Sequence, residues 1–417
     1  MTDLLPFLKD LLSAPGLSGY EDPAARIIAY QWRPLVHALS RGQLGSLHGL
    51  RRGTGPEPRP SVMVATHMDA IGLMVTGITE GFLRLTQVGG VDARVLPGTP
   101  VTVFATGTGA SGAGATGTGA SGAGATGAGA TGAGVTGAGA SGAGATGTGA
   151  SGAGATGAGA TGTGAGASGP SPLPGVIAQP SAHLLPPQEE AGGPVALENL
   201  LVDTGLLPRK VLELVRVGDL VSFAQPPVEL AGETLAGHSL DNRASVAALT
   251  VCLEELQGRA HAWDVWAVAT SQEEVGTLGA AASTFELHPA IALVVDVTWA
   301  RGPGATSDWN AFPLGKGPTI AMGPNMHPAL HKAMKELADK LEIPYALEYT
   351  PAHSGTDGWA TQVAAEGIPT LVLGIPLRYM HTPVELVAIQ DIQRAGRLLA
   401  EFIAALAPDF MEKIIWE

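Results

Sequence analysis

The chain has 417 residues, with 37 acidic against 23 basic side chains and a formal net charge of −14 at pH 7. This length predicts two or three domains, and the acidic balance argues against a nucleic-acid partner. The single cysteine, Cys252, cannot form an intramolecular disulfide, which is typical of a reducing cytoplasm. No signal-peptide pattern is present, and no apolar run of about 18 residues excludes charge and glycine. We therefore expect a cytoplasmic protein without a membrane span.

The first 70 residues begin an α/β pattern. Leu4–Leu12 is predicted to be a short amphipathic helix, and Asp22, followed by proline, is typical of the N-cap of a second helix. Ser61–Thr66 is apolar and predicts a buried strand that leads into a His-Met-Asp run. On an extended chain His67 and Asp69 face the same side. One can therefore bind a metal ion while the other accepts the second ring proton and fixes the tautomer.

Residues 71–225 alternate short apolar runs with turn residues, which indicates a small inserted β domain. Within it, Thr106–Ala165 repeats pentads of the form [Thr/Ser]-Gly-[Ala/Thr]-Gly-Ala, with Val135 as the exception. Because glycine makes ordering entropically costly, we predict a flexible, disordered loop that extends one hairpin of this domain. The alternative is a silk-like stacking segment, since small alternating side chains can pack in flat sheets.

The α/β pattern returns from about residue 226. Asp241 lies where a helix to Gln257 begins, and a role as N-cap would by itself explain an aspartate there. Asp264–Thr270 is apolar and β-branched, and this predicted strand leads into Glu273 and Glu274. Two adjacent carboxylates in an apolar setting repel each other and lose hydration. A nearby cation is the expected compensation.

Two later strands also lead into polar side chains. Ile291–Val295 is an apolar strand followed by Asp296, and Pro369–Leu373 leads into a loop that carries His381. Helices are predicted between and after these strands, at 325–341, 355–366 and 389–406. The alternation of strands and helices favours a parallel sheet with helices on its faces.

Six polar side chains therefore follow strands or short loops of one predicted sheet, at the edge where ligand sites form. They are His67, Asp241, Glu273, Glu274, Asp296 and His381. Nitrogen and oxygen ligands without cysteine suit Zn²⁺, Co²⁺ or Mn²⁺. Their number suits two ions bridged by a carboxylate. One of the two adjacent glutamates then binds metal and the other takes a proton from the bridging water.

Six motifs, in order, resemble the co-catalytic metallo-aminopeptidases of the tetrahedral aminopeptidase type, a family that also includes proteins called glutamyl aminopeptidase and cellulase M. The motifs are His67-Met68-Asp69-Ala70-Ile71-Gly72, Asp241-Asn242-Arg243, Gln272-Glu273-Glu274-Val275-Gly276, Asp296-Val297-Thr298, Gly355-Thr356-Asp357 and Arg378-Tyr379-Met380-His381-Thr382-Pro383. The resemblance covers nearly the whole chain except the repeat. Ala70 and Ser245 depart from the family pattern, which usually has Glu and Gly there, but neither is a ligand position.

The resemblance implies a fold and an assembly. The fold is α/β: a zinc-exopeptidase-type, three-layer α/β/α catalytic domain formed by residues 1–70 and 226–417. Residues 71–225 form an inserted small β-barrel domain, PDZ-like, which serves dimerisation or lines a channel and carries the repeat at 106–165. The implied assembly is a homo-oligomer built from dimers, a dodecamer in the family.

The resemblance also implies roles for the candidate residues. The metal ligands are His67, Asp241 as the bridge, Glu274, Asp296 and His381, which hold two divalent ions, Zn²⁺ or Co²⁺, with Mn²⁺ as the alternative. Glu273 is the general base, and Asp69 orients His67. The implied activity is removal of N-terminal residues from peptides by a metal-bridging hydroxide. His353, Asp357 and Arg378 are candidates for substrate contact, and the preferred N-terminal residue does not follow from the motifs.

Three other functions fit parts of the pattern. Dinuclear deacylases and carboxypeptidases share the ligand order, but their accessory domain lies late in the chain, whereas the long insertion here lies between His67 and Asp241. A glycosidase would use paired carboxylates but would leave His67 and His381 without a task. A catalytically silent assembly or scaffold protein, with the repeat as its working part, is disfavoured by the intact ligand set.

Overall fold

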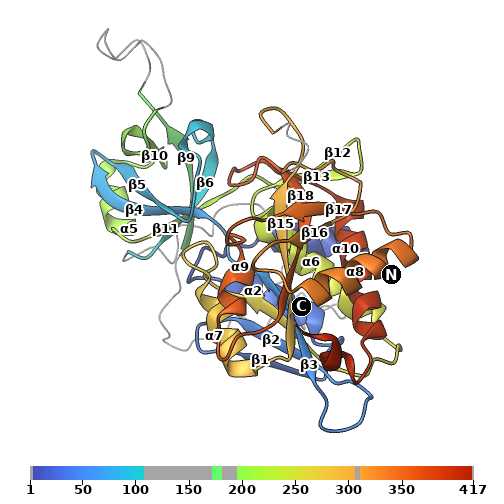
Figure 1. Ribbon diagram of the computed structural model, residues 1–417. Coiled ribbons are helices and arrows are strands. Elements are labelled where there is room, and N and C mark those ends of the chain that lie inside the picture. The colour runs from blue at the N-terminus through green and yellow to red at the C-terminus, as the bar shows by residue number, and fades with distance from the viewer. Residues whose placement is uncertain (1–2, 108–170, 181–194, 306–309, 416–417) are drawn as a thin grey trace, which may run out of the picture.

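The computed structural model describes residues 3–107, 171–180, 195–305 and 310–415. In this part, the chain forms a mixed α/β fold with a large sheet and, beside it, a closed β-barrel (Figure 1). Apart from Thr106 and Gly107, the predicted repeat at 106–165 lies outside the described residues, so its predicted disorder stays a prediction. None of the described helices combines the length and the apolar character needed to cross a bilayer.

The large sheet has 11 strands among the described residues. From edge to edge its main path runs through β1 (Ala38–Arg41), β2 (Leu47–Arg51), β14 (Asp264–Thr270), β3 (Ser61–His67), β15 (Ile291–Trp299), β18 (Thr370–Arg378), β19 (Glu385–Ala388), β13 (Thr234–Gly237) and β12 (Val228–Leu230). Two further strands branch from β18: β16 (Thr319–Met322) pairs with it, and β17 (Ala346–Tyr349) pairs with β16. Strands β14, β3, β15 and β18 pair in parallel, so their carboxyl ends meet at one edge of the sheet.

Helices cover the sheet because its central strands are apolar on both faces. The helices of this part are α1 (Leu4–Ser13), α2 (Asp22–Trp32), α6 (Leu240–Glu255), α7 (Leu278–Leu287), α8 (Pro328–Lys340), α9 (Asp357–Gln362) and α10 (Ile389–Ala405). Helices α6 and α10 pack against each other and on the central strands, and α7 packs with α9 on the other side (Figure 1). Cys252 lies in α6 and is fully buried.

The barrel closes through strands of residues 72–223. In order around it they are β10 (Leu201–Asp203), β5 (Phe82–Val88), β4 (Gly72–Thr79), β11 (Leu220–Phe223), β6 (Pro100–Ala105) and β9 (Ser171–Ala178), with helix α5 (Pro208–Leu214) beside them. Its described core is separate from the core of the large sheet and is built from apolar side chains. Strands β6 and β9 pair with Ala105 opposite Ser171, so the chain between them connects two neighbouring strands. The predicted domain boundaries and the PDZ-like identity stay predictions.

Several elements differ from their predicted bounds. Strand β15 continues through Asp296 to Trp299, because it keeps its ladder with β18 along that stretch. Helix α2 is preceded by Glu21 instead of being capped by Asp22. The Glu21 carboxylate accepts hydrogen bonds from the backbone N–H groups of Gly19 and Gln272, a long-range contact that local sequence does not encode.

Candidate active site

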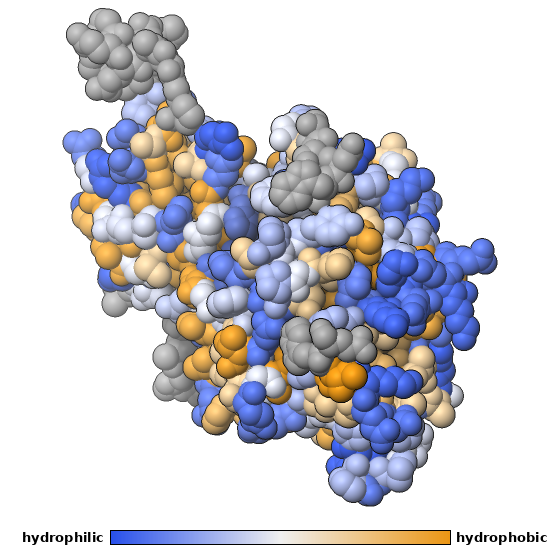
Figure 2. Space-filling view, in the orientation of Figure 1, coloured by the Kyte–Doolittle hydropathy of each residue, from blue (hydrophilic) through white to orange (hydrophobic). Residues whose placement is uncertain are grey.

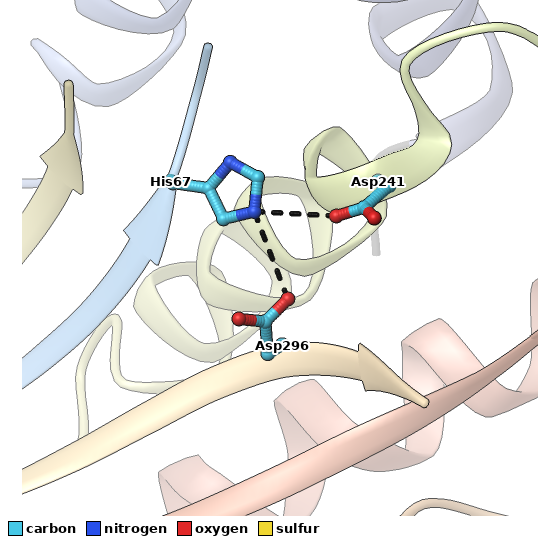
Figure 3. A group of neighbouring side chains, drawn as sticks. All are labelled: His67, Asp241 and Asp296. Carbon is cyan, nitrogen blue, oxygen red and sulfur yellow. Dashed lines mark ion pairs between the residues drawn. The ribbon is translucent and has the colours of Figure 1, made fainter. Parts of the chain in front are cut away.

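Three polar side chains from three elements meet at the carboxyl edge of the parallel strands (Figure 3). His67 is the last residue of β3, Asp296 lies in β15, and Asp241 lies at the start of α6. The Nε2 atom of His67 is 3.2 Å from an Asp241 carboxylate oxygen and 3.7 Å from one of Asp296. All three residues are buried. Their facing nitrogen and oxygen atoms form the first ligand group, which could hold a metal ion.

A second ligand group shares Asp241. The Nε2 atom of His381 lies 3.4 Å from Oδ2 of Asp241 and 3.6 Å from Oε2 of Glu274. His67 faces the other oxygen of the same carboxylate, Oδ1. Asp241 thus presents one oxygen to each histidine, which is the arrangement that a bridging carboxylate requires. The alternative role as N-cap does not describe this residue, because Ser239 precedes α6 as its N-cap and the Asp241 carboxylate faces the histidines.

The two glutamates that follow β14 are held by Asp69. The backbone N–H groups of Glu273 and Glu274 donate to the two oxygens of Asp69 at 3.0 and 3.1 Å. The same carboxylate accepts from the hydroxyl of Ser18 at 2.6 Å and lies 3.4 Å from Nδ1 of His67. Asp69 therefore contacts both His67 and the glutamate turn. Ser18 lies 51 residues before its partner, and sequence reasoning missed it.

Glu385 is another residue that sequence reasoning missed. It is buried, and its two carboxylate oxygens accept from the backbone N–H groups of Asp241 and His381, each at 3.0 Å. One side chain therefore ties together the backbones of two predicted ligands. Its place four residues after His381 is visible in the sequence, but its burial, which makes hydrogen-bond donors necessary, comes from the fold.

Among the described residues that line the site, histidines are the only side chains that can offset the carboxylate charges. Burial raises the pKa of Glu273 to about 8 and the pKa of Glu274 and Asp296 well above the usual range, and the neighbouring Asp241 adds to the effect. Burial also acts against ionised Asp241, but hydrogen bonds from His381 and His67 outweigh it and lower its pKa to about 2. Within the described part of the chain, one oxygen of Glu274 has no hydrogen-bond partner. Clustered carboxylates with an unpartnered oxygen fit divalent cations in the two ligand groups.

The backbone near the ligands adopts unusual conformations. Ser239, Gln272, Tyr379 and His381 all have positive φ values between 58° and 63°. Such conformations disfavour residues other than glycine and cluster at functional sites. In this chain they turn the loops so that the Asp241, Glu273–Glu274 and His381 side chains face one centre.

A cavity of about 450 Å³ opens over the two ligand groups. It is lined by ligand-group residues and by side chains of β15, β16, β17 and β18. The barrel also reaches it, through the loop after β5: a Cβ on Gly90 would lie 3.0 Å from the ring of His381. The absence of a side chain at Gly90 therefore lets the barrel approach the site closely.

The predicted substrate contacts do not belong to the described lining of this cavity. His353 is exposed, and its ring lies 5.2 Å from that of Trp359 at an angle of 51°, while Arg378 donates to the backbone carbonyl of Arg301. Asp357 is buried and accepts a hydrogen bond from the hydroxyl of Thr270. Burial raises the pKa of Asp357 to about 6. These positions remain predictions for substrate contact.

Comparison with known proteins shows one family. The family model described as M42 glutamyl aminopeptidase matches residues 45–119 and 166–398. A lysyl aminopeptidase of Pyrococcus furiosus is 28% identical over 406 residues, covering 96% of this chain and 97% of that protein.

Solved structures of aminopeptidases also match this chain along nearly its whole length. The aminopeptidase APDkam598 from Desulfurococcus kamchatkensis has a TM-score of 0.76 at 28% identity, covering 99% of this chain and 97% of that one. The TET1 peptidase of Pyrococcus horikoshii, described as able to assemble into a tetrahedron or a large octahedral shell, has a TM-score of 0.71 at 25% identity. The match covers 97% of this chain and 100% of that one.

Proposed function

The chain belongs to the M42 glutamyl aminopeptidase family and is a metal-dependent aminopeptidase, and from this premise we propose that each of its ligand groups holds one divalent ion. His67, Asp241 and Asp296 hold the first ion, and Asp241, Glu274 and His381 hold the second. The observation that carries the proposal is the division of the Asp241 carboxylate between the two histidines. The ligand types suit Zn²⁺ or Co²⁺, with Mn²⁺ as the alternative.

We assign Glu273 as the general base. When bound, the two ions lower the pKa of a water molecule and polarise the peptide carbonyl. Glu273 stands beside the first ligand group, with Oε2 3.8 Å from Nε2 of His67. It takes a proton from the attacking water and returns it to the leaving amine. Its neighbour Glu274 faces His381 instead, so the two glutamates have different tasks.

Asp69 is a positioning residue in this proposal. Its contact with Nδ1 of His67 leaves Nε2 of that ring to face Asp241, the shared residue of the two ligand groups. Its hydrogen bonds to the backbone of Glu273 and Glu274 fix the general base relative to that histidine. The free α-amine of the peptide would lie near the second ligand group, and this gives exopeptidase specificity.

The assembly is proposed to be a homo-oligomer built from dimers, a dodecamer. The barrel exposes large apolar side chains, among them Leu207, Leu212 and Val217, and apolar residues gather on its surface in Figure 2. Exposed apolar patches of this kind mark contact surfaces. Leu212→Lys should therefore reduce the molar mass measured by light scattering. An unchanged mass would count against the barrel as the contact.

The function is tested with Glu273→Gln. We expect two ions per subunit by elemental analysis in both proteins, and a kcat that is about 10²- to 10⁴-fold lower in the variant. Full peptidase activity in a metal-loaded variant would refute the assignment. The substrate panel should contain aminoacyl-anilides, N-acyl amino acids and N-terminally blocked peptides. Turnover of the last two classes in place of the first would show a deacylase or carboxypeptidase.

A further inference from the structure

A carboxylate outside the ligand groups reaches the same cavity. Glu348 lies on the edge strand β17, and its oxygens accept hydrogen bonds from the hydroxyls of Thr298 on β15, at 2.7 Å, and Thr319 on β16, at 2.5 Å. Glu348 and Thr298 line the cavity together with Gly374 of β18. These three residues are called the Glu348 wall.

Gly374 makes room for this carboxylate. A Cβ at position 374 would lie 2.9 Å from Oε2 of Glu348 and 2.4 Å from Oγ1 of Thr319. Contacts this short are not tolerated, so any side chain on β18 at this point would displace the Glu348 carboxylate. The backbone of β18 is thus built to admit an acid that comes from two strands away.

The hydrogen bonds favour an ionised Glu348. The hydroxyl oxygen of Thr319 accepts from the backbone N–H of Gly374 at 3.1 Å, so its own hydrogen is directed to the closer Glu348 oxygen. Burial raises the pKa of Glu348, while the two threonine hydroxyls lower it. No lysine or arginine is found among the described residues that line the cavity. A carboxylate in such a setting gains most from a cation that arrives with the substrate.

The Glu348 wall lies close to the first ligand group, and the gap between them has room for one substrate side chain. Thr298 follows Asp296 by two residues on β15, so both face the same side of the sheet, about 6.5 Å apart along the strand. The lining of the same cavity includes the apolar side chains of Ala321, Met326 and Val372. Apolar side chains and an acid in one cavity match a methylene stem with a cationic head.

We propose that the Glu348 wall binds the side chain of the substrate's N-terminal residue, and that Glu348 makes the enzyme select lysine and arginine over apolar and acidic residues. The inference rests on the proposed aminopeptidase function and adds its substrate class. Glu348 acts here as a specificity-determining residue. It takes no part in the hydrolysis, so its removal changes the choice of substrate and leaves the chemistry intact.

The test compares lysine with norleucine, which has the same stem without the amine. For aminoacyl-p-nitroanilides, wild-type kcat/KM should be at least about 10-fold higher for lysine than for norleucine, and the glutamate anilide should be the poorest. Glu348→Gln should lower kcat/KM for lysine by about 10- to 100-fold, the usual range for a lost charge-assisted hydrogen bond, and change norleucine by less than about 3-fold. Glu336→Gln removes the same charge from the exposed side of α8 and is the matched control.

Several results would overturn the inference while leaving the proposed function in place. The first is equal kcat/KM for lysine and norleucine in the wild-type enzyme, and the second is an equal loss for both substrates in Glu348→Gln. The third is a higher kcat/KM for the dipeptide Ala-Lys than for Ala-norleucine, which would place the lysine preference at the second residue of the substrate. Calorimetry with free L-lysine and L-norleucine on metal-loaded wild-type protein measures their affinity for the site and requires neither turnover nor a variant. Lysine should bind at least about 10-fold more tightly, and equal affinity would refute the inference. Absence of turnover on every anilide would instead refute the proposed function.

Discussion

The carboxylates on two walls of one cavity have different surroundings. On one side Asp241, Glu274 and Asp296 crowd around two histidines, and one oxygen of Glu274 has no hydrogen-bond partner among the residues that the structure describes. On the other side Glu348 stands apart and receives hydrogen bonds from two threonine hydroxyls. Crowded carboxylates repel one another and need a cation held permanently in place. A single acid that is held by hydroxyl groups can bind a cation that arrives and leaves with each substrate.

Replacing the shared ligand should have the largest effect. Asp241→Asn removes a charge from both ligand groups at once. Because bound metal supplies several kcal/mol of transition-state stabilisation, kcat/KM should fall on the order of a thousandfold. Elemental analysis should show fewer than two ions per subunit. The exposed Asp10 in α1 offers Asp10→Asn as a control for the loss of charge. Two retained ions and near-normal activity would contradict the bridging role.

Removing the metal should destabilise the fold. With the ions gone, the carboxylates of the two ligand groups face one another without compensation. Each ion present at a hundred times its Kd should add about 2.7 kcal/mol to the free energy of unfolding. Calorimetric melting of chelated and reloaded protein measures the difference. A Tm that does not respond to reloading would mean that these carboxylates do not hold metal.

Asp69→Asn should reduce activity less than the loss of a ligand. The amide keeps the shape of the side chain but presents an N–H group where Asp69 accepts backbone donors. Loss of such an orienting contact typically costs about 10- to 100-fold in metal affinity or activity. Ser18→Ala removes one hydrogen bond to the same carboxylate and should cost less. Metal titration followed by steady-state kinetics separates the two quantities. Wild-type values for Asp69→Asn would exclude its positioning role.

The smallest effect is expected on the Glu348 wall. Thr298→Val removes one hydroxyl from the carboxylate and leaves the bond from Thr319 in place. The lysine-to-norleucine ratio of kcat/KM should fall by about 3- to 10-fold, as for one ordinary hydrogen bond, because the carboxylate itself remains. Metal content should stay at the wild-type level. A change in metal content with no change in the ratio would mean that the two walls are not independent.

Most of the fold could be predicted from local pattern. Strand β14 has its predicted bounds, and α1, α6, β3 and α10 lie within a few residues of theirs, because apolar runs and periodicity are local signals. The predicted family and its enzyme class are confirmed by the family model. The end of β15 was set too early, since a strand continues as long as its ladder with a neighbour does.

The sequence by itself determined which residue types stand at the carboxyl ends of the strands, and in what order. A polar residue after an apolar strand is a local signal, so the candidate ligands could be named before the fold was known. Only the tertiary structure decided that one Asp241 oxygen faces each histidine and that Asp69 holds the backbone of both glutamates. It also brought Glu348 and Gly374, from different strands, to one wall. The physical reason is that such contacts join residues far apart in the chain. Strand register and the close approach of backbones determine these contacts, and no local periodicity encodes them.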